Sequence, residues 1–90
     1  MTNAEILDFI NTEVRNEKGT RVTIDSLWKD TNLDSFGHTM VFCALDDKYQ
    51  YFSKAGYGKN PFAEIPYSTL TVAEVIDTCM LETTPTSSLQ

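Results

Sequence analysis

The sequence predicts an all-α fold, a bundle of three long helices and one short helix with a long loop between the first two. Three stretches carry apolar residues at three- and four-residue spacing, which is the period of one helix face. Two of these stretches begin with the pattern Thr-x-x-Glu, in which each side chain bonds a free backbone N–H of the other residue. The alternation typical of strands is confined to residues 21–24. A chain of 90 residues is sufficient for one domain with a modest core.

The first helix is predicted over about Asn3 to Arg15. Thr2 and Glu5 supply its capping box, and the apolar stripe behind them consists of Ile6, Leu7, Phe9, Ile10 and Val14. Residues 16–33 lack a helical period, because charged residues and a glycine interrupt the apolar positions. We therefore expect a long packed loop there, with one short turn around Asp25 to Lys29.

A second helix is predicted from Ser35 to about Tyr51. Its apolar face would consist of Phe36, Val41, Phe42, Leu45 and Tyr49. Two glycines and two prolines then interrupt residues 52–70. This stretch predicts a loop with one short helix at Pro61 to Ile65, since proline suits the first position of a helix.

The last helix is predicted over about Thr71 to Leu81. Thr71 and Glu74 form its capping box, and Val72, Val75, Ile76, Cys79 and Met80 follow at helical spacing. The residues beyond it are polar and lack a helical period. We expect residues 1–82 to form the bundle and residues 83–90 to form a disordered tail.

Composition narrows the classes of function. The formal net charge of -6 argues against nucleic acid as a partner, since phosphate backbones bind clustered lysine and arginine. No stretch has the length of a membrane span or the pattern of a signal peptide, so a cytoplasmic location is expected. Cys43 and Cys79 fall at apolar helical positions and are predicted to be reduced core residues. No feature of the sequence demands an oligomer, so we expect a monomer.

Ser35 is the candidate functional residue, because it lies where a polar loop ends and a helical pattern begins. Serine is a favoured helix cap, since its oxygen accepts a bond from a free N–H of the first turn. A hydroxyl at this junction also suits the attachment of an anionic group, because the helix N-terminus offers N–H donors and the positive end of a dipole. Position alone leaves both interpretations open.

The residues around Ser35 carry a family resemblance. Leu33-Asp34-Ser35-Phe36 resembles the Asp-Ser-Leu signature of the acyl carrier protein family, with Phe36 in place of the usual leucine. Leu45-Asp46-Asp47-Lys48-Tyr49 near the end of the second helix also looks like that family. So does Thr71-Val72-Ala73-Glu74-Val75-Ile76-Asp77, which opens the last helix. The resemblance covers about residues 3–81 and implies a four-helix bundle of acyl carrier protein type.

The resemblance implies a carrier protein and not an enzyme. In this family a phosphopantetheinyl transferase uses coenzyme A and magnesium to attach 4'-phosphopantetheine to the serine hydroxyl. By resemblance Ser35 is the attachment residue, and Asp34 and Phe36 flank it as recognition residues. The arm would carry an acyl chain as a thioester and present it to acyl-transferring or synthase enzymes of fatty acid biosynthesis and lipid metabolism.

Other interpretations compete with this one. The chain could be an unmodified helical interaction module that keeps the carrier fold, or a carrier of aminoacyl or peptidyl cargo. A hydrolytic set of Ser35, His38 and Asp34 is disfavoured, because Asp34 adjoins the serine and is poorly placed to orient the imidazole. Asp30, Asn32 and Asp34 alternate like calcium ligands, but the glycine and glutamate of a calcium-binding loop are missing. Met40 is expected to face solvent as a contact for a partner, or else to fill the core.

Overall fold

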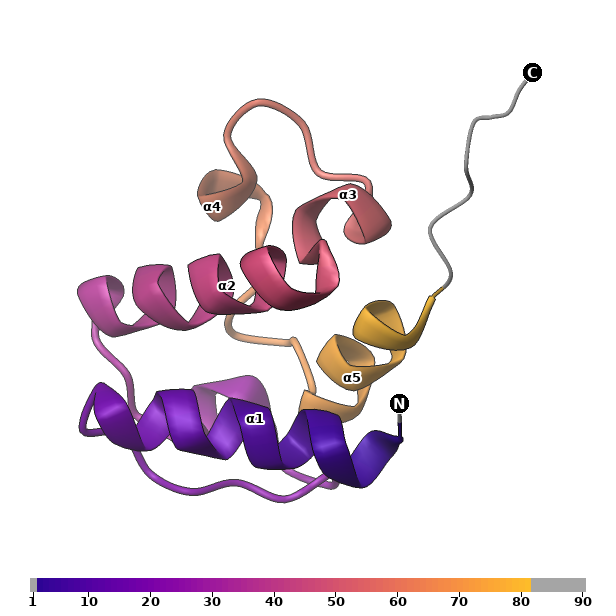
Figure 1. Ribbon diagram of the computed structural model, residues 1–90. Coiled ribbons are helices and arrows are strands. Elements are labelled where there is room, and N and C mark those ends of the chain that lie inside the picture. The colour runs from indigo at the N-terminus through magenta and orange to yellow at the C-terminus, as the bar shows by residue number, and fades with distance from the viewer. Residues whose placement is uncertain (1, 82–90) are drawn as a thin grey trace.

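The computed structural model describes residues 2–81, and within them the fold is all-α, as predicted. The elements, in chain order, are α1 (Asn3–Asn16), the 3-10 helix η1 (Trp28–Thr31), α2 (Ser35–Tyr49), α3 (Tyr51–Ala55), α4 (Pro61–Glu64) and α5 (Val72–Met80). In Figure 1, α1 and α2 lie one above the other, α5 closes one end of the pair, and α3 and α4 lie above α2. None of the helices in this part of the chain is long and apolar enough to cross a bilayer.

The core lies where α1, α2 and α5 meet. Its side chains come from the apolar stripes of the three long helices and from the loops between them. The fully buried members are Ile6, Ile10, Val14, Trp28, Val41, Phe42, Leu45, Val72, Val75, Ile76 and Cys79. The helical periodicity of the sequence therefore identified the faces that pack together.

Both predicted capping boxes are present. The Thr2 hydroxyl accepts from the Glu5 backbone N–H at 3.2 Å, and Glu5 accepts from the Thr2 backbone N–H at 2.8 Å. Thr71 and Glu74 repeat the exchange at 3.0 and 2.9 Å. These pairs fix where α1 and α5 begin, because they satisfy donors that the helix itself leaves open.

The long loop after α1 is held by specific bonds. The buried Asn11 amide donates to the Val22 carbonyl at 2.9 Å and accepts from the Val22 backbone N–H at 2.8 Å. Farther along, the Trp28 backbone N–H donates to the Leu70 carbonyl, beside a single bridge pairing of Leu27 with Thr71. The short turn lies at Trp28–Thr31, so the predicted position of Asp25 to Lys29 was about three residues early.

The predicted second helix was wrong at its C-terminal end. α2 stops at Tyr49 because Gln50 adopts the left-handed conformation, with φ 60°. The chain restarts as α3, whose first turn is fixed by a 3.0 Å bond from the Phe52 backbone N–H to the Asp46 carboxylate. The described fold thus has one more short α-helix than was predicted. The predicted tail at 83–90 lies outside the described residues.

Candidate functional site

Ser35 is the first residue of α2 and its side chain is exposed. Of the two interpretations of Ser35, its role as the helix cap was wrong, since the cap is Asp34. The Asp34 carboxylate accepts the Gly37 backbone N–H at 2.7 Å, a short distance typical of a charged acceptor. A carboxylate also suits the positive end of the helix dipole. Asp34, and not Ser35, therefore caps α2.

Gly37 allows this cap to close tightly. A Cβ at this position would lie 3.2 Å from the Asp34 carboxylate oxygen and 3.1 Å from a Leu33 methyl group. Both distances are closer than ordinary van der Waals contact. Glycine is a poor helix former, but in the first turn it leaves room for Asp34 to approach the N–H that it accepts.

The Ser35 hydroxyl is left available for chemistry. Among residues 2–81 it has no hydrogen-bond partner. Ser35 is one of the residues that line a pocket of about 590 Å³, which are Leu33, Asp34, Ser35, His38, Thr39, Phe62 and Tyr67. Residues far apart in the sequence therefore meet beside the serine, and they include polar side chains from α2 and two aromatic rings.

His38 is held in place by a contact that the sequence did not indicate. The Trp28 indole N–H donates to His38 Nδ1 at 3.1 Å, and the imidazole packs on the Tyr67 ring with centroids 4.6 Å apart. An indole nitrogen only donates, so Nδ1 carries no proton and the ring proton of neutral His38 is on Nε2. Burial lowers the pKa of His38, and the nearby Asp34 carboxylate partly opposes this shift.

This arrangement does not form a hydrolytic set. The Asp34 carboxylate bonds Gly37, and His38 Nδ1 is occupied by Trp28, so no acid orients the far side of the imidazole.

The residues that alternate like calcium ligands form hydrogen bonds within the fold. Asp30 accepts from the Leu27 backbone N–H at 3.3 Å, and Asn32 donates to the Thr20 hydroxyl at 3.1 Å. Within the described residues no cluster of three or more histidine, cysteine or acidic side chains could hold a metal ion.

The exposed face of α2 is apolar near the serine. Phe36 is 66% exposed, which is a correction to its predicted place on the core face, and Met40 is 42% exposed. Both cysteines were predicted to lie in the core. The prediction is confirmed for Cys79, which is buried, and wrong for Cys43, which is exposed. Burial raises the pKa of the Cys79 thiol to about 12. The first turn of α2 carries no acidic side chain after the cap.

The site therefore offers a free hydroxyl, a helix N-terminus and a mixed polar and aromatic pocket in one place. No protein-family model, curated protein or solved structure matches this chain. A hydroxyl that is not hydrogen-bonded to a base is a weak nucleophile, and the Ser35 hydroxyl has no such bond within residues 2–81.

Proposed function

We propose that this protein is an acyl carrier protein, with 4'-phosphopantetheine attached at Ser35. The single observation that carries the proposal is the exposed Ser35 hydroxyl at the start of α2, without a partner among residues 2–81 and beside a capping Asp34. The resemblance of Leu33-Asp34-Ser35-Phe36 to the family signature coincides with this position. The arm would supply a terminal thiol that carries the acyl group as a thioester.

The geometry of the helix start supports attachment at this residue. Forming a phosphodiester requires an accessible oxygen, and the nucleotide portion of coenzyme A leaves as the new bond forms. The attached phosphate would carry a negative charge beside the N-terminal turn of α2, where backbone N–H groups and the helix dipole favour an anion. Because Asp34 supplies the cap, modification of Ser35 costs the helix no capping bond.

The pocket beside Ser35 fits an arm that contains both amide and methylene groups. His38 Nε2–H is a donor, the Thr39 side chain is polar, and Leu33, Phe62 and Tyr67 are apolar surfaces. The interior of the bundle is filled by rings instead, since Phe42 packs on Trp28 at 4.8 Å and on Tyr51 at 5.2 Å. We expect a short acyl chain to lie in the surface pocket and not between the helices.

The arrangement of the long helices also supports a carrier of this type. In the proposed assignment α1, α2, α4 and α5 are the four helices of the family bundle, residues 17–34 are its long first loop, and α3 is an addition. Partner transferases and synthases would approach α2, whose exposed Phe36 and Met40 give an apolar contact surface. The proposed location is the cytoplasm and the proposed state is a monomer.

A second candidate function rests on the same two exposed side chains. A helix that exposes Phe36 by 66% and Met40 by 42% could bind another protein through α2 without any modification of Ser35. The chain would then be a helical interaction module with the carrier fold. The two functions differ in whether the Ser35 oxygen forms a covalent bond.

Intact-mass measurement tests the proposal directly. The purified protein is incubated with coenzyme A, magnesium and a broad-specificity phosphopantetheinyl transferase, and the expected gain is the mass of one phosphopantetheine unit. Ser35→Ala should abolish the gain. Ser53→Ala is the matched control, because Ser53 is also an exposed serine in a helix, and this variant should gain the same mass as the wild type.

Either of two results would overturn the proposal. One is the absence of a mass gain in a preparation whose circular dichroism shows a folded helical protein. The other is a mass gain that persists in Ser35→Ala, because the attachment would then lie elsewhere. The first result would favour the unmodified interaction module.

A further inference from the structure

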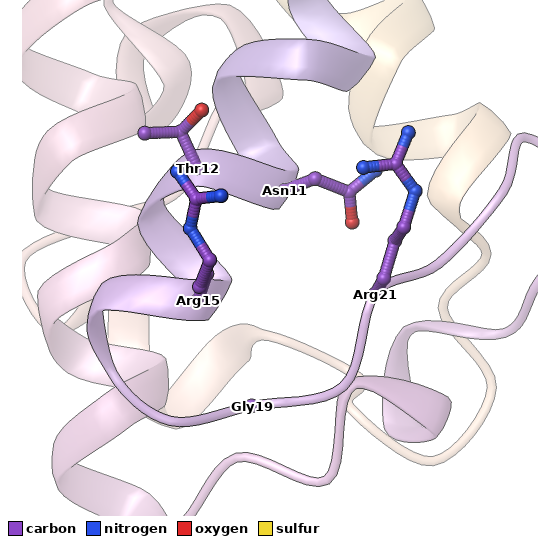
Figure 2. A pocket seen from close by; sticks show the side chains of 5 residues that line it. All are labelled: Asn11, Thr12, Arg15, Gly19 and Arg21. Atoms are coloured by element: carbon purple, nitrogen blue, oxygen red, sulfur yellow. The ribbon is translucent and has the colours of Figure 1, made fainter.

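A second pocket brings together both arginines of the chain. It has a volume of about 290 Å³ and is lined by Asn11, Thr12, Arg15, Gly19 and Arg21. Arg15 and Arg21 are the only arginines in the 90 residues. Figure 2 shows their guanidinium groups on either side of the pocket, with Asn11 between them and Gly19 on the loop that joins them. None of these five residues lines the pocket beside Ser35.

The backbone that carries the two arginines is fixed at several points. Arg15 belongs to the last turn of α1, and Arg21 precedes Val22, whose backbone forms two bonds with the buried Asn11 amide. Between them, the Gly19 backbone N–H donates to the Val14 carbonyl at 2.8 Å and the Thr20 backbone N–H donates to the Thr31 carbonyl at 2.7 Å. The fold therefore sets the distance between the backbone positions of Arg15 and Arg21.

Gly19 is required for this close packing. A Cβ at Gly19 would lie 2.7 Å from a Val14 methyl group and 2.8 Å from the Thr31 carbonyl oxygen. The second contact is to backbone, which cannot move aside as a side chain can. Glycine lets the loop pass directly under the end of α1, so that Arg21 returns to the side of the helix that carries Arg15.

The charge of the pocket is unusual for this protein. The chain has 13 acidic residues and 7 basic ones, yet among residues 2–81 no carboxylate pairs with Arg15 or Arg21. The lining residues include no acidic side chain. The Thr12 hydroxyl already donates to the Asp8 carbonyl, but the Asn11 amide, which is 6% exposed, has a second N–H beyond the one given to Val22. The pocket is thus rich in donors and poor in acceptors.

We propose that this pocket binds a phosphate group, held by Arg15 and Arg21 from opposite sides. Guanidinium groups present rigid forks of N–H donors that match phosphate oxygens. A phosphate dianion offers more oxygens and more negative charge to two arginine forks than a single carboxylate does. The volume suits inorganic phosphate or a small phosphate monoester, and is small for a nucleotide.

The proposal is tested by calorimetric titration of inorganic phosphate and of glycerol 3-phosphate, with sodium chloride holding the ionic strength constant. The wild type should bind each saturably with one site. Arg15→Gln and Arg21→Gln should each weaken binding by about tenfold or more, because each removes charge-assisted hydrogen bonds. Lys59→Gln is the matched control, since it removes the same charge from an exposed residue outside this pocket. It should leave the affinity within about twofold.

Several outcomes would overturn the proposal. Absence of phosphate binding to the wild type would contradict the proposal. If Lys59→Gln weakens phosphate binding as much as the arginine variants do, the phosphate does not bind in this pocket. Acetate that binds as tightly as phosphate at equal ionic strength would contradict the assignment of a phosphate site. Comparison of the two ligands identifies the source, because tighter binding of the monoester indicates a phosphorylated metabolite and tighter binding of the free ion indicates inorganic phosphate.

Discussion

The N-termini of α1 and α5 differ from that of α2 in how the first backbone donors are satisfied. At α1 and α5, a threonine and a glutamate exchange bonds, so each threonine hydroxyl accepts a backbone N–H. At α2 the acceptor is the Asp34 carboxylate, and the following Ser35 hydroxyl has no partner among residues 2–81. The N-termini of α1 and α5 are capped by threonine hydroxyls, whereas the N-terminus of α2 is capped by a carboxylate and its serine hydroxyl forms no hydrogen bond within residues 2–81.

The difference separates the capping bond from the residue to which the proposed attachment is assigned. The oxygen of a serine in the cap position would have to accept a backbone N–H and also carry any group that was joined to it. Moving the cap back by one residue, to Asp34, releases Ser35 from that role. Gly37 completes the arrangement because it lets the Asp34 carboxylate approach closely. Stability at this site is therefore expected to depend on Asp34, and the proposed modification on Ser35.

The largest effect is expected from removing the α2 cap. Asp34→Ala should lower the free energy of unfolding by about 1–2 kcal/mol, because the Gly37 N–H loses a charged acceptor at the start of the central helix. Asp34→Asn should retain most of the stability, since asparagine is also a good cap. Urea denaturation of both variants measures the difference. Equal losses in the two variants would mean that the charge of Asp34, and not its capping bond, stabilises α2.

A smaller effect is expected from pH. His38 must be neutral at Nδ1 to accept the Trp28 N–H, and burial lowers the pKa of its imidazole from the ordinary value of 6.5. The unfolded chain therefore binds a proton at a higher pH than the folded chain does. Stability should be lost as the pH falls below about 6.5 and through the lower pKa of the folded state.

His38→Gln isolates this contribution, because a glutamine oxygen can accept the Trp28 N–H and does not titrate. Denaturation midpoints of the two proteins should diverge between neutral and acid pH, with the wild type losing more. Parallel pH profiles would show that His38 does not couple folding to protonation. Asp34 is the charged group that opposes this lowering of the His38 pKa, and the uncharged Tyr67 ring packs on the imidazole.

The smallest effect is expected from the open hydroxyl. Ser35→Ala should change the free energy of unfolding by less than about 0.5 kcal/mol, since the hydroxyl has no partner in the described part of the chain. Thr71→Ala is the comparison, and it should cost about 1 kcal/mol because its hydroxyl accepts the Glu74 N–H. A loss in Ser35→Ala as large as that in Thr71→Ala would remove the distinction between the two helix starts.

Local patterns were sufficient to predict most of the fold. The Thr-x-x-Glu pairs located the starts of α1 and α5, and the apolar spacing identified the buried faces of the long helices, including Val41 and Leu45. Pro61 correctly marked the start of α4. These features depend on residues three or four positions apart, which the sequence displays directly.

The errors arose where a distant contact or a backbone conformation decided the outcome. Gln50 ends α2 by adopting a positive φ, and a glutamine in the sequence does not predict this conformation. Asp34 and Ser35 are both good caps, and only the structure shows which of them bonds the backbone. The contact of Trp28 with His38 joins residues on two different elements, and no periodic pattern indicates it. The pocket of Arg15 and Arg21 depends likewise on the path of a loop.

Trp28 gives the protein a built-in optical reporter. It is the sole tryptophan of the chain, it is fully buried, and its indole N–H is bonded to a residue that lines the pocket beside Ser35. An indole emits light whose wavelength depends on the polarity around it. The wall of the Ser35 pocket can therefore be observed by intrinsic fluorescence, without a label and without background from a second tryptophan.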